Sequence, residues 1–411
     1  MMNSESRPPS SVLRPPSSVR ALRRPSPVRA LAALALVFLA AAGLYLSPIG
    51  RVWRLNRMDT RSLMLQTLRS PDDFEAQMAL GRRLERDSQD SDAMAAYRQA
   101  SLLHPKSAEA FAGLARTSLA AGDPAAALTA ARRALSLDPA APTAQRTEGE
   151  AKETQGDLLG ARAALQTAVR TDPADAVAWE DLSRAALRSD AWDLARSAAE
   201  RASALAPERA APLVVLGEAL IHLNRAPEAL TLLERAVKID PKSAEAWLYL
   251  GQARINAGGS AAGSAETALR RAAVLDPHNS MPPFLLGTLL ESQGQIPAAI
   301  TAYRKAVSLN PGDTTALYRL SQALQASGQA AEAAGVRRQF VDVSDYQRTA
   351  TELQERIARL EKAGQTSPDA MARLYFQLAA LRKSHGDATD AAIAYRLGAA
   401  ARARQRMKDE G

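Results

Sequence analysis

The most constraining feature of this sequence is a ladder of seven prolines. Successive members are 34 residues apart, except for one interval of 36, and they are Pro105, Pro139, Pro173, Pro207, Pro241, Pro277 and Pro311. Proline lacks an amide N–H and clashes with the preceding turn of a helix, so each of these residues marks a helix end. A fixed period of this size predicts an array of structural repeats.

Two further positions recur with the same period. The first is occupied by a small residue: Gly81, Ala115, Gly149, Ser183, Gly217, Gly251, Gly287, Ser321 and Ala379. The second, in most units 12 residues later, is always alanine: Ala93, Ala127, Ala161, Ala195, Ala229, Ala265, Ala299, Ala333 and Ala391. Positions restricted to small side chains are expected where two helices cross closely. The pattern therefore predicts helix pairs that pack through small residues.

At these positions the chain resembles the tetratricopeptide repeat family, whose unit is a helix–turn–helix of 34 residues. The family's aromatic residue in the second helix matches Tyr97, Tyr303 and Tyr395, and the turn between the helices matches Gly122, Gly156, Gly294, Gly328 and Gly386. The resemblance covers roughly residues 74–347, with a divergent copy near 372–405. It implies an all-α, right-handed superhelical solenoid.

The distribution of charge argues against nucleic acid as a partner. The chain carries a formal net charge of +8, and residues 1–61 contain ten arginines and two acidic residues. The remaining 350 residues therefore hold 42 basic and 42 acidic side chains. Because the repeats have no net positive charge, binding of RNA or another polyanion is the weaker hypothesis.

The basic N-terminal region surrounds a hydrophobic segment. Residues 1–29 are rich in Pro, Ser and Arg, and we expect a disordered tail there. Residues 30–50 are uncharged and long enough to span a bilayer as a helix. A cleaved signal peptide is the alternative, because Ala40–Gly43 offers small residues to a peptidase. The arginine distribution favours a cytoplasmic N-terminus and an extracytoplasmic array, which would be periplasmic in a bacterium.

The remaining chain divides into four predicted regions. Residues 51–73 form a juxtamembrane helix and linker, and residues 74–347 form eight repeats. Residues 348–366 form a capping helix and linker, because the proline ladder stops after Pro311 and Asp345 stands where the next proline is due. Residues 367–411 contain a divergent ninth repeat and a tail.

The residues that bind a partner are sought on the first helix of each repeat. In the family, residues three before and one after the small position line a concave groove. The predicted site combines arginines from the N-terminal repeats with an apolar stripe from the C-terminal ones: Arg82, Arg116, Arg146, Arg184, Val214, Leu248, Phe284 and Tyr318. We expect a peptide whose apolar anchors contact the stripe and whose acidic residues meet the arginines.

The sequence carries no motif for catalysis or cofactor binding. There is no cysteine, the four histidines lie in separate repeats, and no GxSxG, HExxH or GxGxxG pattern occurs. We therefore expect no enzyme activity, cofactor, metal or small-molecule substrate. The predicted function is that of a membrane-anchored scaffold or adaptor for protein or peptide partners. The alternative is an accessory subunit of an envelope enzyme, or of a secretion or cytochrome-maturation assembly.

Overall fold

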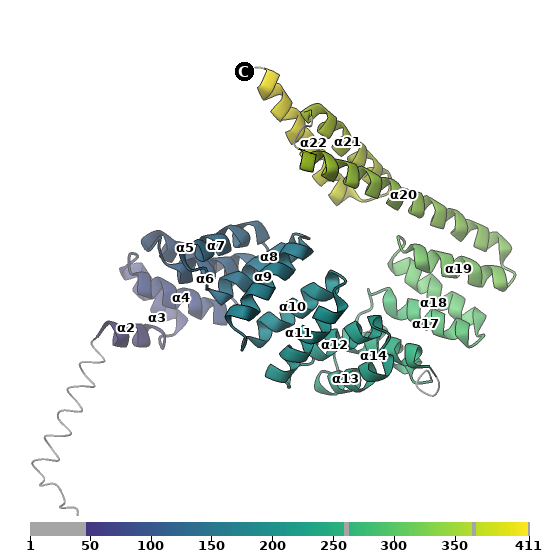
Figure 1. Cartoon of the computed structure of the whole chain (residues 1–411), viewed down its shortest axis with the longest axis horizontal. Coiled ribbons are helices and arrows are strands. Elements are labelled where there is room, and N and C mark those ends of the chain that lie inside the picture. The colour runs from purple at the N-terminus through teal and green to yellow at the C-terminus, as the bar shows by residue number, and fades with distance from the viewer. Residues whose placement is uncertain (1–46, 259–262, 364–366, 410–411) are drawn as a thin grey trace, which may run out of the picture. The chain divides into compact units, whose positions relative to one another are not determined.

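A computed structural model of the chain describes residues 47–258, 263–363 and 367–409. Within these ranges there are 20 helices and no strand, and successive helices form antiparallel pairs (Figure 1). The prediction of an all-α repeat array is confirmed. The chain divides into two compact units, Met1–Thr147 and Glu148–Gly411. The right-handed superhelical path of the array stays a prediction.

Unit 1 begins with two short helices, α2 (Pro48–Leu55) and α3 (Thr60–Arg69), and continues with repeat pairs. These pairs are α4 (Phe74–Arg86) with α5 (Asp90–Leu103) and α6 (Ala108–Ala120) with α7 (Pro124–Leu137). Helix α3 packs against α4. The next helix, α8 (Pro142–Thr154), starts in unit 1 and ends in unit 2.

Unit 2 contains the remaining repeats. Its helices are α9 (Leu158–Thr171), α10 (Ala176–Arg188), α11 (Trp192–Leu205), α12 (Ala211–His222), α13 (Ala226–Ile239), α14 (Ala244–Ala257), α16 (Ala265–Leu275), α17 (Met281–Ser292), α18 (Ile296–Leu309), α19 (Thr314–Ala326), α20 (Ala330–Ala363), α21 (Pro368–Ser384) and α22 (Ala388–Asp409).

The predicted membrane segment, residues 30–50, lies almost entirely outside the described residues. Its last three residues belong to α2, whose N-cap Ser47 accepts a hydrogen bond from the Gly50 amide. In the part of the chain that the structure describes, no helix has the length and apolar character needed to cross a bilayer.

The proline ladder lies in the turns that follow the second helices. Asp138, before Pro139, has an extended backbone (φ −138°, ψ 96°), as the residue before a proline prefers. The proline carbonyl oxygen accepts a hydrogen bond from a side chain six residues later. Trp179 Nε1 donates to Pro173 O at 3.1 Å, and Trp247 Nε1 donates to Pro241 O at 3.0 Å. The aromatic residues of the first helices therefore also fix the turn before them.

A left-handed residue ends each first helix, as the predicted glycine turns require. Gly122 has φ +81° and Gly156 has φ +83°. Ser88, Asp190 and Asn224 adopt the same conformation in the repeats that lack glycine. This region of φ suits glycine best, and short polar residues tolerate it better than other non-glycine residues do.

The small positions allow a large side chain of the second helix to be fully buried. Tyr97 of α5 is 1% exposed and lies between Gly81 of α4 and Gly113 of α6. A Cβ added to Gly113 would come within 2.5 Å of Tyr97 Cε1. Leu233 contacts Gly217 and Tyr303 contacts Gly287 in the same way. The predicted small-residue packing is confirmed.

The C-terminal boundaries differ from the prediction. Residues 330–363 form one continuous helix, α20, in place of a repeat helix that ends near 347 and a separate capping helix at 348–366. No proline occurs between 330 and 363, so nothing interrupts the helix where the ladder stops. The predicted apolar stripe of this helix packs against α21 and α22, with Ile357, Leu374 and Ala394 in one core cluster. The second half of α20 therefore supports the terminal repeat, whereas its first half packs against α19 as the second helix of the eighth repeat.

A matched pair of glycine substitutions tests the small-residue packing. Gly113→Ala places a methyl group against the buried Tyr97 ring, and overpacking of this kind costs about 1–3 kcal/mol of the free energy of unfolding. A Cβ added by Gly335→Ala, in the second turn of α20, meets nothing within 4 Å. This substitution should instead stabilise by up to about 1 kcal/mol, because alanine favours a helix over glycine. Urea unfolding followed by circular dichroism measures both, and a gain at Gly113 would contradict the packing.

Candidate functional site

The predicted arginines of unit 1 take part in a cluster of internal ion pairs on the first helices. Arg116 of α6 donates from Nε to Glu85 Oε1 at 2.6 Å and from Nη2 to Glu85 Oε2 at 2.8 Å. Tyr97 Oη donates to the same carboxylate at 3.0 Å. The Glu85 carboxylate of α4 therefore joins two helices of one repeat to the first helix of the next.

The pKa values in this cluster follow from burial and charge. Burial alone would raise the pKa of the Glu85 carboxyl, but the hydrogen bonds and charge of Arg116 outweigh it, and the pKa is lowered. The charge of Arg146 on α8 lowers the same pKa. Burial first, and then the Glu85 charge, raise the pKa of Tyr97 above its ordinary value. Glu85 is therefore ionised, and Tyr97 neutral, at physiological pH.

The second arginine of unit 1 is also paired. Arg82 of α4 donates to Glu109 Oε1 at 2.6 Å and to Asn56 Oδ1 at 3.2 Å. This pair is more exposed, with 67% of the Glu109 side chain accessible, so it stabilises the fold little. The predicted arginines of unit 1 are thus brought near internal carboxylates, which reduces what they can offer to an acidic ligand.

Unit 2 repeats this arrangement with more deeply buried carboxylates. The predicted Arg184 pairs with Asp181 on the same helix, α10. Arg188 Nη1 donates to Glu153 Oε1 at 2.8 Å, and Arg209 Nη2 lies 3.0 Å from Glu180 Oε2. Burial raises the pKa of the Glu180 carboxyl, and the charge of Arg209 opposes this.

These glutamate partners were missed by the sequence analysis. Glu85, Glu153 and Glu291 each stand four residues after the small position of a first helix, and each lies within ion-pair distance of an arginine in the next first helix. Tyr303 Oη donates to Glu291 Oε2 at 2.6 Å, as Tyr97 does to Glu85. The spacing of 12 residues from glutamate to tyrosine is the sequence signal that could have revealed Glu85 and Glu291; leucine stands at that spacing from Glu153.

The predicted apolar stripe is only partly a surface. Val214 is 4% exposed and Leu248 is 6% exposed, so both belong to the hydrophobic core and cannot act as anchors for a ligand. Val214 lies in a core cluster with residues of α13 and α14, and Leu248 lies in another with Leu269 and Ala272 of α16 and Leu285 of α17. This part of the prediction is corrected.

The two aromatic members of the stripe remain accessible. Phe284 of α17 is half-buried against Tyr303, with ring centroids 6.0 Å apart. Tyr318 of α19 is 46% exposed and lies 6.0 Å from the ring of Phe340 on α20. We call the exposed Tyr318 of α19, together with the partly exposed Phe284 of α17 and Phe340 of α20, the aromatic end.

Glu218 of α12 is another acidic residue of unit 2 whose pKa is shifted. Burial raises the pKa of the Glu218 carboxyl on α12, and a hydrogen bond from the Tyr249 hydroxyl opposes the rise. Burial and the same hydrogen bond raise the pKa of Tyr249. Neutral tyrosine is a good hydrogen-bond donor to such a carboxylate.

Three histidines stack on aromatic rings. His104 stacks on Phe74 with ring centroids 4.2 Å apart, and His222 stacks on Trp192 at 4.0 Å. His385 stacks on Tyr346 at 4.2 Å. Stacking of this kind adds to helix packing.

The Glu85 cluster predicts a pH-dependent loss of stability. Replacing the carboxylate in Glu85→Gln removes charge-assisted hydrogen bonds to Arg116 and Tyr97, and should lower the free energy of unfolding by about 1–3 kcal/mol at pH 7. Because the folded-state pKa lies below the ordinary value of 4.5, this contribution is present above that pH and is lost as the pH falls through the folded-state pKa.

The measurement is urea unfolding of the wild type and the variant at pH 7 and pH 3.5. The difference between the two stabilities should be smaller at the lower pH. Glu109→Gln, at the exposed pair with Arg82, serves as the matched control and should change stability far less. An equal loss at both pH values for Glu85→Gln would show that the carboxylate charge is not responsible.

Comparison with known families matches these repeats. A tetratricopeptide repeat model matches residues 78–144 and 146–212, and a second matches residues 186–255. A TPR repeat model matches residues 287–328. Together the matches cover just over half of the chain. We found no match to the sequence among curated proteins.

One of three solved structures indicates a shared fold, at low sequence identity. The APC/C hetero-tetramer Cut9–Hcn1 matches with a TM-score of 0.52 and 16% identity, over 64% of this chain and 52% of that chain. This chain therefore aligns with about half the length of that relative. YrrB, described as a TPR protein with an unusual peptide-binding site, matches with a TM-score of 0.38 and 20% identity over 46% of this chain and 97% of that chain.

TTC0263, a thermophilic TPR protein of Thermus thermophilus, matches with a TM-score of 0.39 and 24% identity, over 45% of this chain and 100% of that chain. Of the three scores, only that of Cut9–Hcn1 is high enough to indicate a shared fold. The fold, the buried small-residue contacts and the matched models agree, and the chain belongs to the tetratricopeptide repeat family.

Proposed function

We propose that this protein is a membrane-anchored, non-catalytic scaffold that binds a peptide segment of a protein partner on the first-helix face of its repeats. Membership of the tetratricopeptide repeat family supports a role in protein–protein interaction, and no catalytic family matches the chain. The observation that carries the binding site is the aromatic end, because exposed aromatic side chains are the residues that most often anchor a partner.

The ligand of this site is a short peptide with apolar anchors. Tyr318 and Phe284 offer ring surface, and the Tyr318 hydroxyl can hydrogen-bond a peptide group. The arginines that could hold acidic residues already pair with Glu85, Glu109 and Asp181. Charge on the peptide therefore contributes less than its apolar side chains do.

An accessory role in a larger assembly is the second form of this proposal. The fold relative Cut9–Hcn1 is a hetero-tetramer of the APC/C, and this chain covers about half of that relative. In that case the peptide bound at the aromatic end would belong to one fixed partner, such as a subunit of an envelope enzyme or of a secretion or cytochrome-maturation assembly.

Anchoring rests on the N-terminal sequence and is supported by exposed side chains next to it. Ile49 and Trp53 of α2 and Leu68 of α3 are more than half exposed, and the Arg57 guanidinium lies 4.2 Å from the centre of the Trp53 ring. Arginines beside exposed tryptophan and aliphatic residues suit the interface of a bilayer. The proposed topology is a single pass with a cytoplasmic N-terminus and an extracytoplasmic array.

Peptide selection on the detergent-solubilised full chain tests peptide binding at the aromatic end. A phage-displayed peptide that binds should lose about tenfold or more in affinity with Tyr318→Ser, because an exposed aromatic anchor is removed without opening the core. Leu102→Ser, an exposed apolar residue of α5 outside the aromatic end, is the matched control. Equal effects of the two variants in fluorescence anisotropy would reject the site. Salt-dependent binding of single-stranded RNA would favour the polyanion alternative.

Membrane fractionation tests the anchor. The full chain should stay in the pellet after an alkaline carbonate wash, whereas a variant with Val37→Arg and Leu39→Arg should move to the supernatant, because two charges near the centre of the segment oppose insertion. Protease treatment of intact spheroplasts should digest the array if it is extracytoplasmic. Release of the wild-type chain by carbonate, or a mature N-terminus beyond residue 40, would contradict the anchor.

A further inference from the structure

The last repeat exposes a position that the other repeats bury. This position lies four residues after the recurrent alanine of the second helix. It is 0–1% exposed at Tyr97, Ala131, Leu165, Ala199, Leu233, Leu269 and Tyr303. Tyr395 of α22 occupies the same position and is 61% exposed.

Among the described residues, no helix packs against α22 in the way that α19 packs against α18. In the seventh repeat the same pair of aromatic positions is occupied by Phe284 and Tyr303, and α18 packs against the following helix α19. Leu320, Ala323 and Leu324 of α19 belong to the core cluster that contains Tyr303. Phe376 and Tyr395 form the equivalent pair, with ring centroids 5.3 Å apart, and lack such a cover.

In the eighth repeat, the position four residues after the recurrent alanine is also exposed, but it is occupied by a charged residue. The second helix of this repeat is the first half of α20, and the residue four after Ala333 is Arg337, which is exposed. The chain therefore places a charged residue at one uncovered position and a tyrosine at the other. An aromatic pair left open at the end of a repeat array is a surface shaped for another helix.

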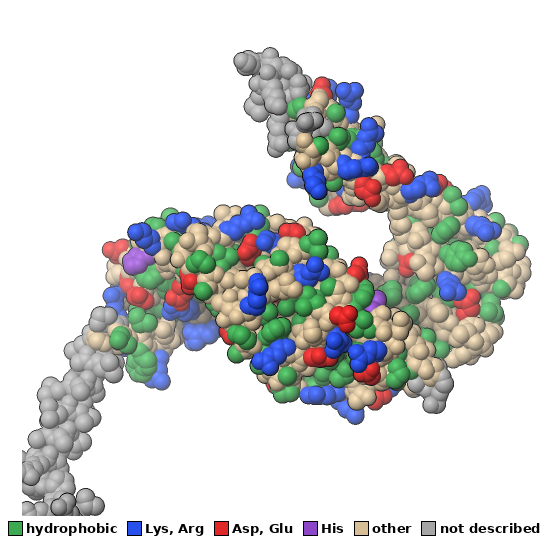
Figure 2. Space-filling view, viewed as in Figure 1, with side chains coloured by type: hydrophobic (Ala, Val, Ile, Leu, Met, Phe, Trp, Pro, Cys, Tyr) green, Lys and Arg blue, Asp and Glu red, His purple; other side chains and the backbone are tan. Residues whose placement is uncertain are grey.

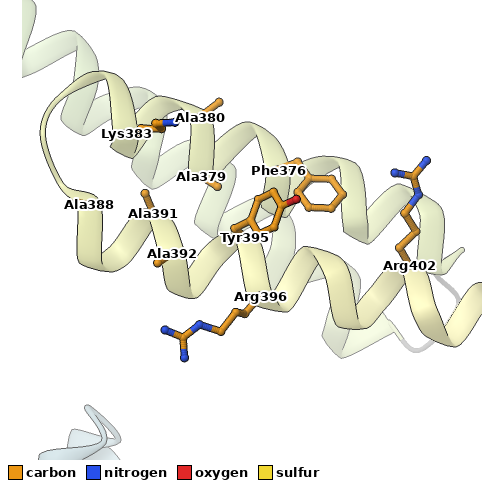
Figure 3. Close-up of a pocket in the computed structure, with 10 residues that line it drawn as sticks. All are labelled: Phe376, Ala379, Ala380, Lys383, Ala388, Ala391, Ala392, Tyr395, Arg396 and Arg402. Carbon is orange, nitrogen blue, oxygen red and sulfur yellow. The ribbon is translucent and has the colours of Figure 1, made fainter.

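The surface around the Phe376–Tyr395 pair is a hollow of about 740 Å³. Figure 3 shows the two rings side by side between α21 and α22, with Ala379, Ala391 and Ala392 along the same face. Ala379 and Ala391 are buried, whereas Ala392 is exposed, and its small side chain lets a helix approach closely. The hollow therefore fits a helix that carries aliphatic side chains and a small residue on one face.

The charge around the hollow indicates an acidic occupant. Lys383, Arg396 and Arg402 line its edge and are exposed. Residues 368–409 contain eight lysine or arginine residues and four aspartates, and Figure 2 shows several Lys and Arg side chains on the α21–α22 pair. A second copy docked on the same face would bring these like charges together, which disfavours self-association.

We propose that the α21–α22 face binds an amphipathic helix of a partner protein, with aliphatic and small residues on its inner face and acidic residues on its flanks. The helix would take the place that α19 has over Phe284 and Tyr303. This site is separate from the aromatic end, so the proposal does not depend on peptide binding at the aromatic end.

A peptide derived from α19 tests the site on the detergent-solubilised full chain. The probe is residues 311–329 of this chain with Arg319→Glu, Gln322→Glu and Gln325→Glu, which leaves the inner face of α19 intact and makes the outer face acidic. The matched control peptide carries lysine at the same three positions. The acidic probe should bind at least about fivefold more tightly than the control at low salt, and this ratio should fall as salt screens the charges.

Two protein variants distinguish the site from its surroundings. Tyr395→Arg, which copies the residue at position 337, should weaken binding of the acidic probe by about tenfold or more, and should leave the thermal melt unchanged because the side chain is exposed. Tyr318→Ser, in the aromatic end, should leave probe binding unchanged. Failure of the acidic probe to bind, or equal binding by Tyr395→Arg, overturns the proposal.

Photocrosslinking identifies the occupant directly. With benzoylphenylalanine in place of Ala392, an exposed residue of the hollow, irradiation should link the full chain to the acidic probe. A linked dimer of the chain would show that a second copy covers the face. A link to residues 1–46 of the same chain would show that its own N-terminal segment does. Either of these results overturns the proposal.

Discussion

The array depends on one recurrent contact, in which a side chain of the second helix, in most repeats a leucine or a tyrosine, packs against a small residue of a first helix. Tyr97 between Gly81 and Gly113 shows why the contact is shared by neighbouring repeats. Neither repeat can bury the ring alone, so stability arises mainly at the boundaries between units, as in other solenoids. The proline turns and left-handed turn residues hold the helices in the register that this contact needs.

A second set of contacts joins successive first helices through charge. Glutamates at one recurrent position face arginines of the next repeat, with Glu85–Arg116 as the most complete example. Once such a pair has formed, its arginine contributes little to the binding of an acidic ligand, because its charge is already paired with a glutamate. The open chemistry of the first-helix face is therefore concentrated in unit 2, at Phe284 and Tyr318.

Sequence reasoning predicted the helix pairs, turns and buried small positions, because each follows from a local rule repeated with a fixed period. It did not distinguish the buried Val214 and Leu248 from the exposed Tyr318, although all three occupy one position of the repeat. Their exposure depends on how closely the next first helix packs, which is a property of the assembled pair. The continuous α20 was missed because helix-ending residues were expected where the chain has none.

The length of α20 also determines how the surfaces at its two ends are rotated relative to each other. Each residue of an α-helix turns the chain by about 100° and advances it by about 1.5 Å. One residue added or lost in the exposed middle of α20 would therefore turn the face that carries Phe376 and Tyr395 by more than a quarter of a revolution relative to Tyr318. The number of residues in α20, and not only their identity, therefore determines the angle between the two aromatic surfaces.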